Sequence, residues 1–212
     1  HDGLYEDYLE RFSRFVSNSR SDLNDPHLPV LTVQLNRFTC YTIEQMDKGW
    51  GSVREAQRQA ALRDEHIFVV PSTDGSTSDG IHNSAASNMA IGQRLAAVAK
   101  RYLYHIDCVC DAPDIGQINK LDNCKLKLKF KNVCSKLAFL GELPPFMIED
   151  DLGAVALKAA KIENNVIFLT AERKFAGRVF VSYQSKQNPD TFCVFDFHSM
   201  LPALSFYRVE AE

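Results

Sequence analysis

Along the first half of the chain, segments with helical spacing of apolar residues alternate with short, continuous apolar runs. Helical spacing extends over 3–19, 50–62 and 84–104, and the last of these is rich in Ala, Leu and Arg. The runs at 29–35 and 66–70 are rich in β-branched residues and predict buried parallel strands. This order of elements predicts an α/β unit.

Two strands are too few for an α/β sheet of this kind. A doubly wound sheet usually has about five strands, and two parallel strands cannot bury both of their faces. We therefore expect the missing strands to come from an upstream segment, either joined to this chain or cleaved and retained.

In the second half, apolar and polar residues alternate with a period of two. Residues 125–131 place Leu126, Leu128 and Phe130 on one face and four lysines on the other, as in a half-buried antiparallel strand. Several short strands in this half predict an antiparallel β-sandwich. Further strands are expected at 166–170, 178–183 and 192–195.

Length, composition and charge narrow the possibilities. The 212 residues are 45% hydrophobic, which is enough for two modest domains with their own cores. We place the boundary near 104–113, giving a first domain over 1–104 and a second over 105–212. The net charge of −3 makes nucleic acid a poor partner, and no apolar run approaches the roughly 20 residues of a membrane span.

Six cysteines raise the question of disulfide bonds, and four of them lie between Cys108 and Cys134. The alternative is buried thiols in a cytosolic protein, because cysteine is often a small core residue. The even number and the clustering slightly favour disulfides, and with them an extracytoplasmic location, whether secreted, lysosomal or periplasmic.

The polar loop after the second strand contains the best candidate for catalysis, Asp79-Gly80-Ile81-His82. An ionised Asp79 can accept a hydrogen bond from one imidazole nitrogen of His82 and leave the other nitrogen as a general base. A serine activated by that base can attack an ester carbonyl. The alternative is that Asp79 shapes a turn and His82 caps the next helix. The loop follows the carboxyl end of a strand, where open α/β sheets bind ligands.

Four motifs occur in order along the chain. They are the strand with a glutamine turn at 29–35, Trp-x-x-x-Arg-x-x-Gln at 50–57, the block at 77–96 that contains Asp79 and His82, and 202–207. Together they resemble the SGNH hydrolases, particularly the sialate O-acetylesterases and related carbohydrate esterases.

This resemblance implies the C-terminal part of a flavodoxin-like three-layer α/β/α SGNH hydrolase domain, followed by the antiparallel β-sandwich domain. It also implies a serine-type carboxylic ester hydrolase that removes acetyl groups from sugars. His82 would be the general base and Asp79 its orienting partner. The implied partner is an O-acetylated carbohydrate, and no metal or other cofactor is expected.

Two parts of the family pattern are not found in these 212 residues. The Gly-Asp-Ser nucleophile block and the Gln-Gly-Glu segment of the family belong upstream, and no serine here lies in a Gly-Asp-Ser or Gly-x-Ser-x-Gly setting. We therefore expect an acetylesterase that is inactive as this chain alone and is completed by an upstream segment or second chain carrying the serine. The alternative is a non-catalytic carbohydrate-binding or interaction protein derived from the esterase fold.

Trp50, Arg54 and Gln57 lie about one helical turn apart, and the resemblance places this helix start near the rim of the active site. Arg54 or Gln57 can hydrogen-bond a sugar hydroxyl or a carboxylate, so all three are candidate substrate-binding residues. The alternative is that Trp50 is packed, Arg54 pairs with an acid and Gln57 is solvated.

Two other clusters are weaker candidates for ligand sites. His105, Cys108 and Cys110 lack the paired spacing of structural zinc sites. The acidic run at 149–151 lacks the alternating ligand spacing of a calcium loop, and we expect it to form a solvated turn.

Overall fold

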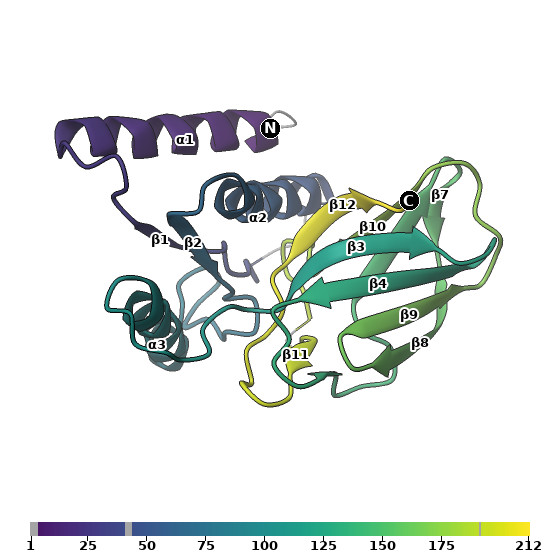
Figure 1. The fold of residues 1–212 in the computed structure, drawn as a ribbon. Helices are drawn as coiled ribbons and strands as arrows, with labels where there is room; N and C mark the ends of the chain where they lie inside the picture. Colours follow the sequence, from purple (N-terminus) through teal and green to yellow (C-terminus); the bar gives the residue numbers. More distant parts are fainter. Residues whose placement is uncertain (1–3, 41–43, 191) are drawn as a thin grey trace.

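A computed structural model gives the structure of residues 4–40, 44–190 and 192–212 (Figure 1). Gly3, where the first helix was expected to start, lies outside these residues. The elements of the first half are α1 (Leu4–Asp22), β1 (Val30–Val33), α2 (Glu44–Arg63), β2 (Ile67–Val70) and α3 (Ala85–Tyr102).

The first half has helices on both faces of a two-stranded parallel sheet, as Figure 1 shows. On one face, Val16 of α1 and Ala60 of α2 pack with Ile67 of β2. On the other face, Ile91 of α3 packs with Val70. The three layers of the expected α/β/α fold are therefore confirmed, although the sheet has two strands. No helix among the described residues has the length and apolar character to cross a membrane.

The second half consists mainly of two four-stranded antiparallel sheets, with strand orders β3-β4-β9-β8 and β12-β10-β6-β7, and β5 pairs with β11 in a small third sheet. The strands are β3 (Asp114–Lys120), β4 (Lys125–Lys131), β5 (Leu137–Ala138), β6 (Phe146–Asp150), β7 (Gly153–Val155), β8 (Leu157–Glu163), β9 (Val166–Ala171), β10 (Val179–Tyr183), β11 (Phe195–Asp196) and β12 (Phe206–Glu210).

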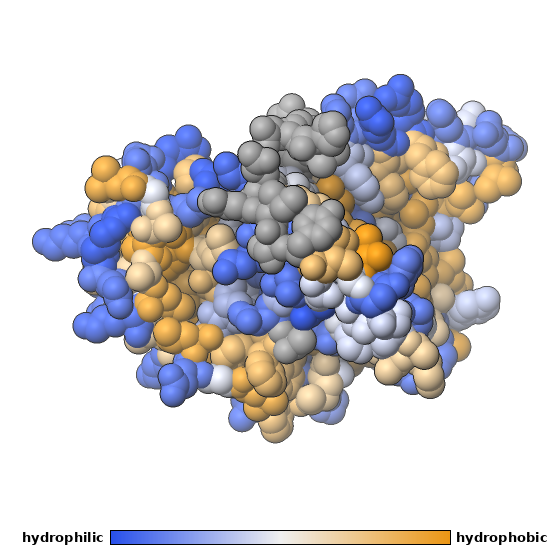
Figure 2. Space-filling model, turned by 180° about the vertical axis from the view of Figure 1, so that it is seen from behind, coloured by the Kyte–Doolittle hydropathy of each residue, from blue (hydrophilic) through white to orange (hydrophobic). Residues whose placement is uncertain are grey.

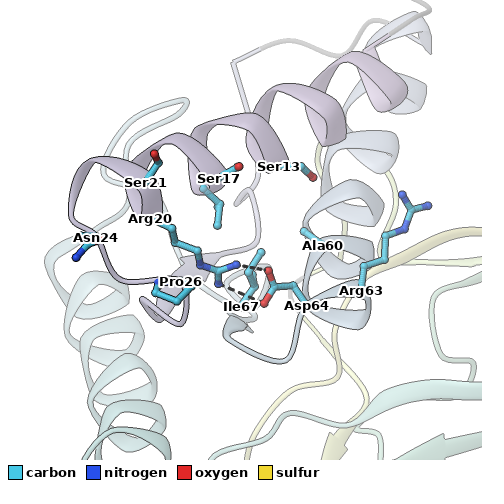
Figure 3. A pocket seen from close by; sticks show the side chains of 11 residues that line it. Ser13, Ser17, Arg20, Ser21, Asn24, Pro26, Ala60, Arg63, Asp64 and Ile67 are labelled. Carbon is cyan, nitrogen blue, oxygen red and sulfur yellow. Dashed lines mark hydrogen bonds and ion pairs between the residues drawn. The ribbon is translucent and has the colours of Figure 1, made fainter.

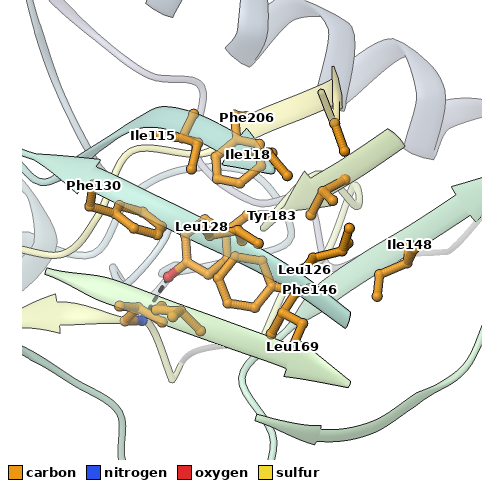
Figure 4. Packing of buried hydrophobic residues seen from close by; sticks show 14 of the residues in the cluster. Ile115, Ile118, Leu126, Leu128, Phe130, Phe146, Ile148, Leu169, Tyr183 and Phe206 are labelled. Carbon is orange, nitrogen blue, oxygen red and sulfur yellow. Dashed lines mark hydrogen bonds between the residues drawn. The ribbon is translucent and has the colours of Figure 1, made fainter. Parts of the chain in front are cut away.

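The two larger sheets share one hydrophobic core (Figure 4). Leu126, Leu128 and Phe130 of β4 are all buried in it, as the alternation along this strand predicts. From the other sheet, Tyr183 and Phe206 contribute aromatic rings whose centroids are 5.8 Å apart. The Tyr183 hydroxyl is also satisfied, because the Val194 N–H donates to it at 2.7 Å. These packed sheets confirm the expected sandwich.

Several elements differ from the sequence predictions. α2 begins at Glu44, before the expected start at Trp50. The sequence prediction missed these first turns because Gly49 and Gly51 weaken their helical signal. The strand expected at 192–195 retains only Phe195, its last residue, which begins β11. The prediction of a solvated turn at the acidic run is wrong for Asp150.

Asp150 ends β6 and is buried, at 8% exposure. Its carboxylate accepts two hydrogen bonds from the Arg173 guanidinium, at 2.5 and 2.9 Å. This bidentate pair joins the segment after β9 to the end of β6, which belongs to the other sheet.

The six cysteines are present as thiols, so the slight preference for disulfides is wrong. Cys110 is buried against Val70 and Ile91, and Cys193 is buried too, as expected for small core residues. Burial, followed by the charge of Asp111, raises the pKa of the Cys110 thiol to about 12. The extracytoplasmic location stays a prediction.

A buried ion-pair network joins α2 to the second half of the chain. The Arg58 guanidinium donates to Asp114 at 2.6 Å and to Glu55 at 2.8 Å, and all three side chains are at most 7% exposed. The Tyr207 N–H donates to the other oxygen of Glu55. Burial lowers the pKa of Arg58, but the two carboxylates raise it by more, so the guanidinium stays charged.

We expect Arg58→Ala to lower the free energy of unfolding by about 3–5 kcal/mol, because it removes the guanidinium from two buried carboxylates and leaves Asp114 only the more distant ammonium of Lys131, at 3.8 Å. Urea denaturation of the complete protein measures this loss. The control is Lys125→Ala, whose pair with Asp122 is exposed and is worth less than about 1 kcal/mol. Equal losses in the two variants would contradict this role of Arg58.

Candidate functional site

Asp79 and His82 lie in the loop that follows β2, and their side chains are in contact. His82 Nδ1 is 2.7 Å from Asp79 Oδ2. Both side chains are open to solvent, with 77% exposure for His82 and 55% for Asp79. Among the described residues no hydrogen bond involves the other ring nitrogen, Nε2, so this atom is available to an incoming group.

The main chain of the loop fixes the charge of Asp79. Asp79 Oδ1 accepts hydrogen bonds from the backbone N–H groups of His82, at 2.7 Å, and Ile81, at 2.8 Å. These bonds, first that of His82, hold the pKa of Asp79 well below its ordinary value. An ionised carboxylate only accepts hydrogen bonds. Nδ1 is therefore the protonated nitrogen of a neutral His82 ring, and Nε2 is the basic one.

His82 does not cap the helix that follows the loop. Ser84 is the N-cap residue of α3, and its hydroxyl accepts the Ser87 N–H. Ser78 N–H donates to the His82 carbonyl at 2.8 Å, which closes the turn around Asp79. The alternative interpretation of this loop is therefore wrong about His82, which does not cap the helix. It is right about Asp79, which shapes the turn.

The segment 34–40, which follows β1, lies against this loop. Thr39 N–H donates to the Gly80 carbonyl at 2.7 Å, and Asn36 Nδ2 donates to Asn83 Oδ1 at 2.5 Å. Gly80 is in close contact with Cys40, because a Cβ at position 80 would lie 1.5 Å from Cys40 Sγ. Since β1 and β2 are parallel, the segments at their carboxyl ends meet at one edge of the sheet.

Arg54 and Gln57, two of the expected substrate-binding residues, are buried, at 0% and 6% exposure. The Gln57 amide donates to the Val33 carbonyl at 3.0 Å and accepts the Leu35 N–H at 2.8 Å. The Gln57 amide thereby makes, at the end of β1, the two main-chain hydrogen bonds that a neighbouring strand would make. The Arg54 guanidinium donates to four main-chain carbonyls. In this structure both side chains bind the main chain, and a contact of either with a substrate stays a prediction.

Trp50 is partly exposed and stacks on Phe38, with ring centroids 5.9 Å apart. Its ring also receives the Arg54 guanidinium, whose central carbon is 5.8 Å from the centroid. A contact of Trp50 with substrate stays a prediction.

Sequence reasoning missed two residues that contact the polar loop after β2, Asn36 and Arg37. Both are buried, and Arg37 Nη2 donates to the Thr73 carbonyl at 2.5 Å. Their position in the sequence could have indicated them, because they follow the first predicted strand and so lie at the same end of the sheet as the His82 loop.

Other parts of the described chain do not offer a comparable site. No group of three metal-ligating side chains occurs among the described residues. A cavity of about 680 Å³ lies between α1 and α2 (Figure 3), beside Ile67 at the start of β2 and so at the opposite end of the sheet from His82. Two of its charged residues, Arg20 and Asp64, pair with each other, and a third, Arg63, also lines it. The reverse face of the molecule mixes hydrophilic and apolar areas (Figure 2).

Comparisons with known proteins give a fold and a family. The crystal structure of a carbohydrate acetylesterase from Xanthomonas citri superposes with a TM-score of 0.82 and 23% identity, over 97% of this chain and 46% of that chain. Two structures of the bacterial S-layer protein SbsC have TM-scores of 0.37 and 0.35 and identities of 11% and 9%. They cover 76% and 78% of this chain and 18% and 32% of theirs. These TM-scores are too low to indicate a shared fold. The comparison with curated proteins gave no match.

The fold is therefore that of a carbohydrate acetylesterase, of which this chain spans about half. Residues 2–101 match the family described as carbohydrate esterase, sialic acid-specific acetylesterase. The match supports, over this part of the chain, the resemblance that the sequence motifs predicted.

We expect Gly80→Ala to lower acetyl ester hydrolysis by the complete protein about 100-fold, because the new Cβ collides with Cys40 and displaces the His82 loop. Steady-state hydrolysis of 4-nitrophenyl acetate measures the loss. Gly92→Ala is the control, since a Cβ at position 92 in α3 meets nothing within 4 Å.

The collision itself can be tested by removing the other partner. Cys40→Gly in the Gly80→Ala background should restore most of the activity. A double variant as inactive as Gly80→Ala would contradict the steric explanation.

Proposed function

We propose that this chain is the C-terminal part of a carbohydrate O-acetylesterase of the sialate O-acetylesterase type. The observation that carries the proposal is the 2.7 Å contact between His82 Nδ1 and Asp79, with the ring exposed at the carboxyl ends of the strands. The substrate class, acetyl esters on sugars such as sialic acid, follows the family that residues 2–101 match.

In the proposed reaction, His82 Nε2 removes the proton from a serine hydroxyl while the serine oxygen attacks the acetyl carbonyl carbon. Asp79 stabilises the imidazolium that forms. The tetrahedral intermediate collapses as His82 gives the proton to the leaving sugar oxygen, and an acetyl-serine remains. Water, deprotonated by His82, then attacks this ester, and His82 returns the proton to the departing serine oxygen, which releases acetate and the free serine.

The serine is proposed to come from a segment outside residues 1–212, whether joined to this chain or on a second one. Within the described part of the chain, no serine hydroxyl is hydrogen-bonded to the His82 ring, and Ser78 bonds its carbonyl instead. The outer edge of β1 has no strand partner there, which leaves an edge for further strands. The coverage of only 46% of the Xanthomonas enzyme supports the same view.

We expect His82→Ala in the complete protein to lower kcat for 4-nitrophenyl acetate and O-acetylated sialic acid by at least about 100-fold, because the general base is lost. Asp79→Asn should lower kcat by up to about 10,000-fold, because an amide favours the wrong tautomer of His82. Residues 1–212 alone should show no such hydrolysis.

Glu10→Gln is a suitable control because Glu10 is exposed on α1. Hydrolysis by the complete protein that does not depend on His82 would contradict the proposed mechanism. Absence of hydrolysis in the complete protein would favour the non-catalytic carbohydrate-binding alternative.

A further inference from the structure

The segment 34–40, on which the His82 loop lies, is held in place by a residue of α2. This segment continues from β1 without forming regular secondary structure beyond Val33. Arg54 Nε donates to the Leu35 carbonyl at 2.7 Å, and Nη2 donates to the Asn36 carbonyl at 2.9 Å. Arg54 Nη1 donates to the carbonyls of Gln184 and Lys186, at 2.9 and 2.6 Å. One planar guanidinium thus joins the segment to the loop that follows β10.

A second set of contacts joins the same two segments. Phe38 N–H donates to the Gln187 carbonyl at 3.0 Å, and Gln187 Nε2 donates back to the Phe38 carbonyl at 3.3 Å. The helix α2 also touches this loop, because a Cβ at Gly51 would lie 2.8 Å from the Ser185 carbonyl oxygen. The loop 184–187 therefore contacts both the segment and the helix that carries Arg54.

The second half of the chain fixes the loop 184–187 independently. Gln184 has a φ of 51°. Residues other than glycine rarely adopt this left-handed backbone conformation unless surrounding contacts stabilise it. Its side-chain amide donates to the carbonyls of Asp190 and Phe192, at 3.0 and 3.2 Å. The Ser205 hydroxyl, next to β12, donates to the Gln184 carbonyl at 3.0 Å. The β half thus fixes the positions of the Gln184 and Lys186 carbonyls that accept hydrogen bonds from Arg54.

We infer that Arg54 and the loop 184–187 are positioning elements of the esterase site, an inference that rests on the proposed function. They fix the segment 34–40, and this segment holds the His82 loop through Asn36 and Thr39. The β half is therefore a part of the catalytic scaffold rather than a separate appendage. A small displacement of the segment moves the Asp79–His82 pair relative to the serine, which lowers kcat more than it changes KM.

The test combines hydrogen–deuterium exchange with kinetics on the complete protein. Arg54→Lys keeps the charge but loses the planar fork that reaches four carbonyls. We expect faster amide exchange in 36–40 and 78–83, and a kcat for 4-nitrophenyl acetate that is about 10- to 100-fold lower with KM changed by less than about 2-fold. The matched control is Asn165→Ala, which removes a side-chain bond to the Phe130 carbonyl inside the β half and should change neither measurement.

A second variant serves if Arg54→Lys does not fold. Gly51→Ala leaves the Arg54 side chain unchanged but pushes α2 away from Ser185 in the loop 184–187, and Gly92→Ala is its matched control. Gly51→Ala should also speed exchange in 78–83. Unchanged exchange there in each folded variant would overturn the inference. Exchange does not depend on hydrolysis, so absence of esterase activity would contradict the proposed function alone.

Discussion

The Arg54 guanidinium donates to main-chain carbonyls that lie about 18 and 130 residues away along the chain. Placing a cation in a site with 0% exposure is unfavourable unless hydrogen bonds replace those of water, and here four carbonyls do so. Burial, with a smaller effect of Arg37, lowers the pKa of Arg54 to about 9, so the side chain is still charged at neutral pH. The path of the chain after β1 depends on this charged contact.

The position of the candidate catalytic pair follows from that path. The segment after β1 supports the loop after β2, so the pair is held by elements from both halves, although the family match ends at residue 101. Gln34 strengthens the same junction, since its side chain exchanges two hydrogen bonds of 2.9 Å with the main chain of Ser205. The carbohydrate acetylesterase fold extends over 97% of the chain, in agreement with one continuous scaffold.

Local sequence patterns predicted the parts of the fold that depend on local physics. The parallel strands, α3 and the alternating strand β4 follow from periodicity, and the position of His82 follows from the rule for strand ends. Strand β8 was missed because its inner side chains are only partly buried and an irregularity between Leu157 and Ala159 interrupts the alternation. The structural roles of Arg54 and Gln57 were missed because their partners are main-chain atoms, which leave no mark in residue spacing.

The central claim is that the Asp79–His82 pair activates a serine outside residues 1–212. The most direct measurement is labelling of the complete protein with a fluorophosphonate, whose phosphorus is attacked by an activated serine oxygen with loss of fluoride, followed by peptide mass spectrometry. The account predicts one labelled serine outside residues 1–212 and loss of labelling in His82→Ala. A label on a serine within residues 1–212, or labelling that persists without His82, would contradict it.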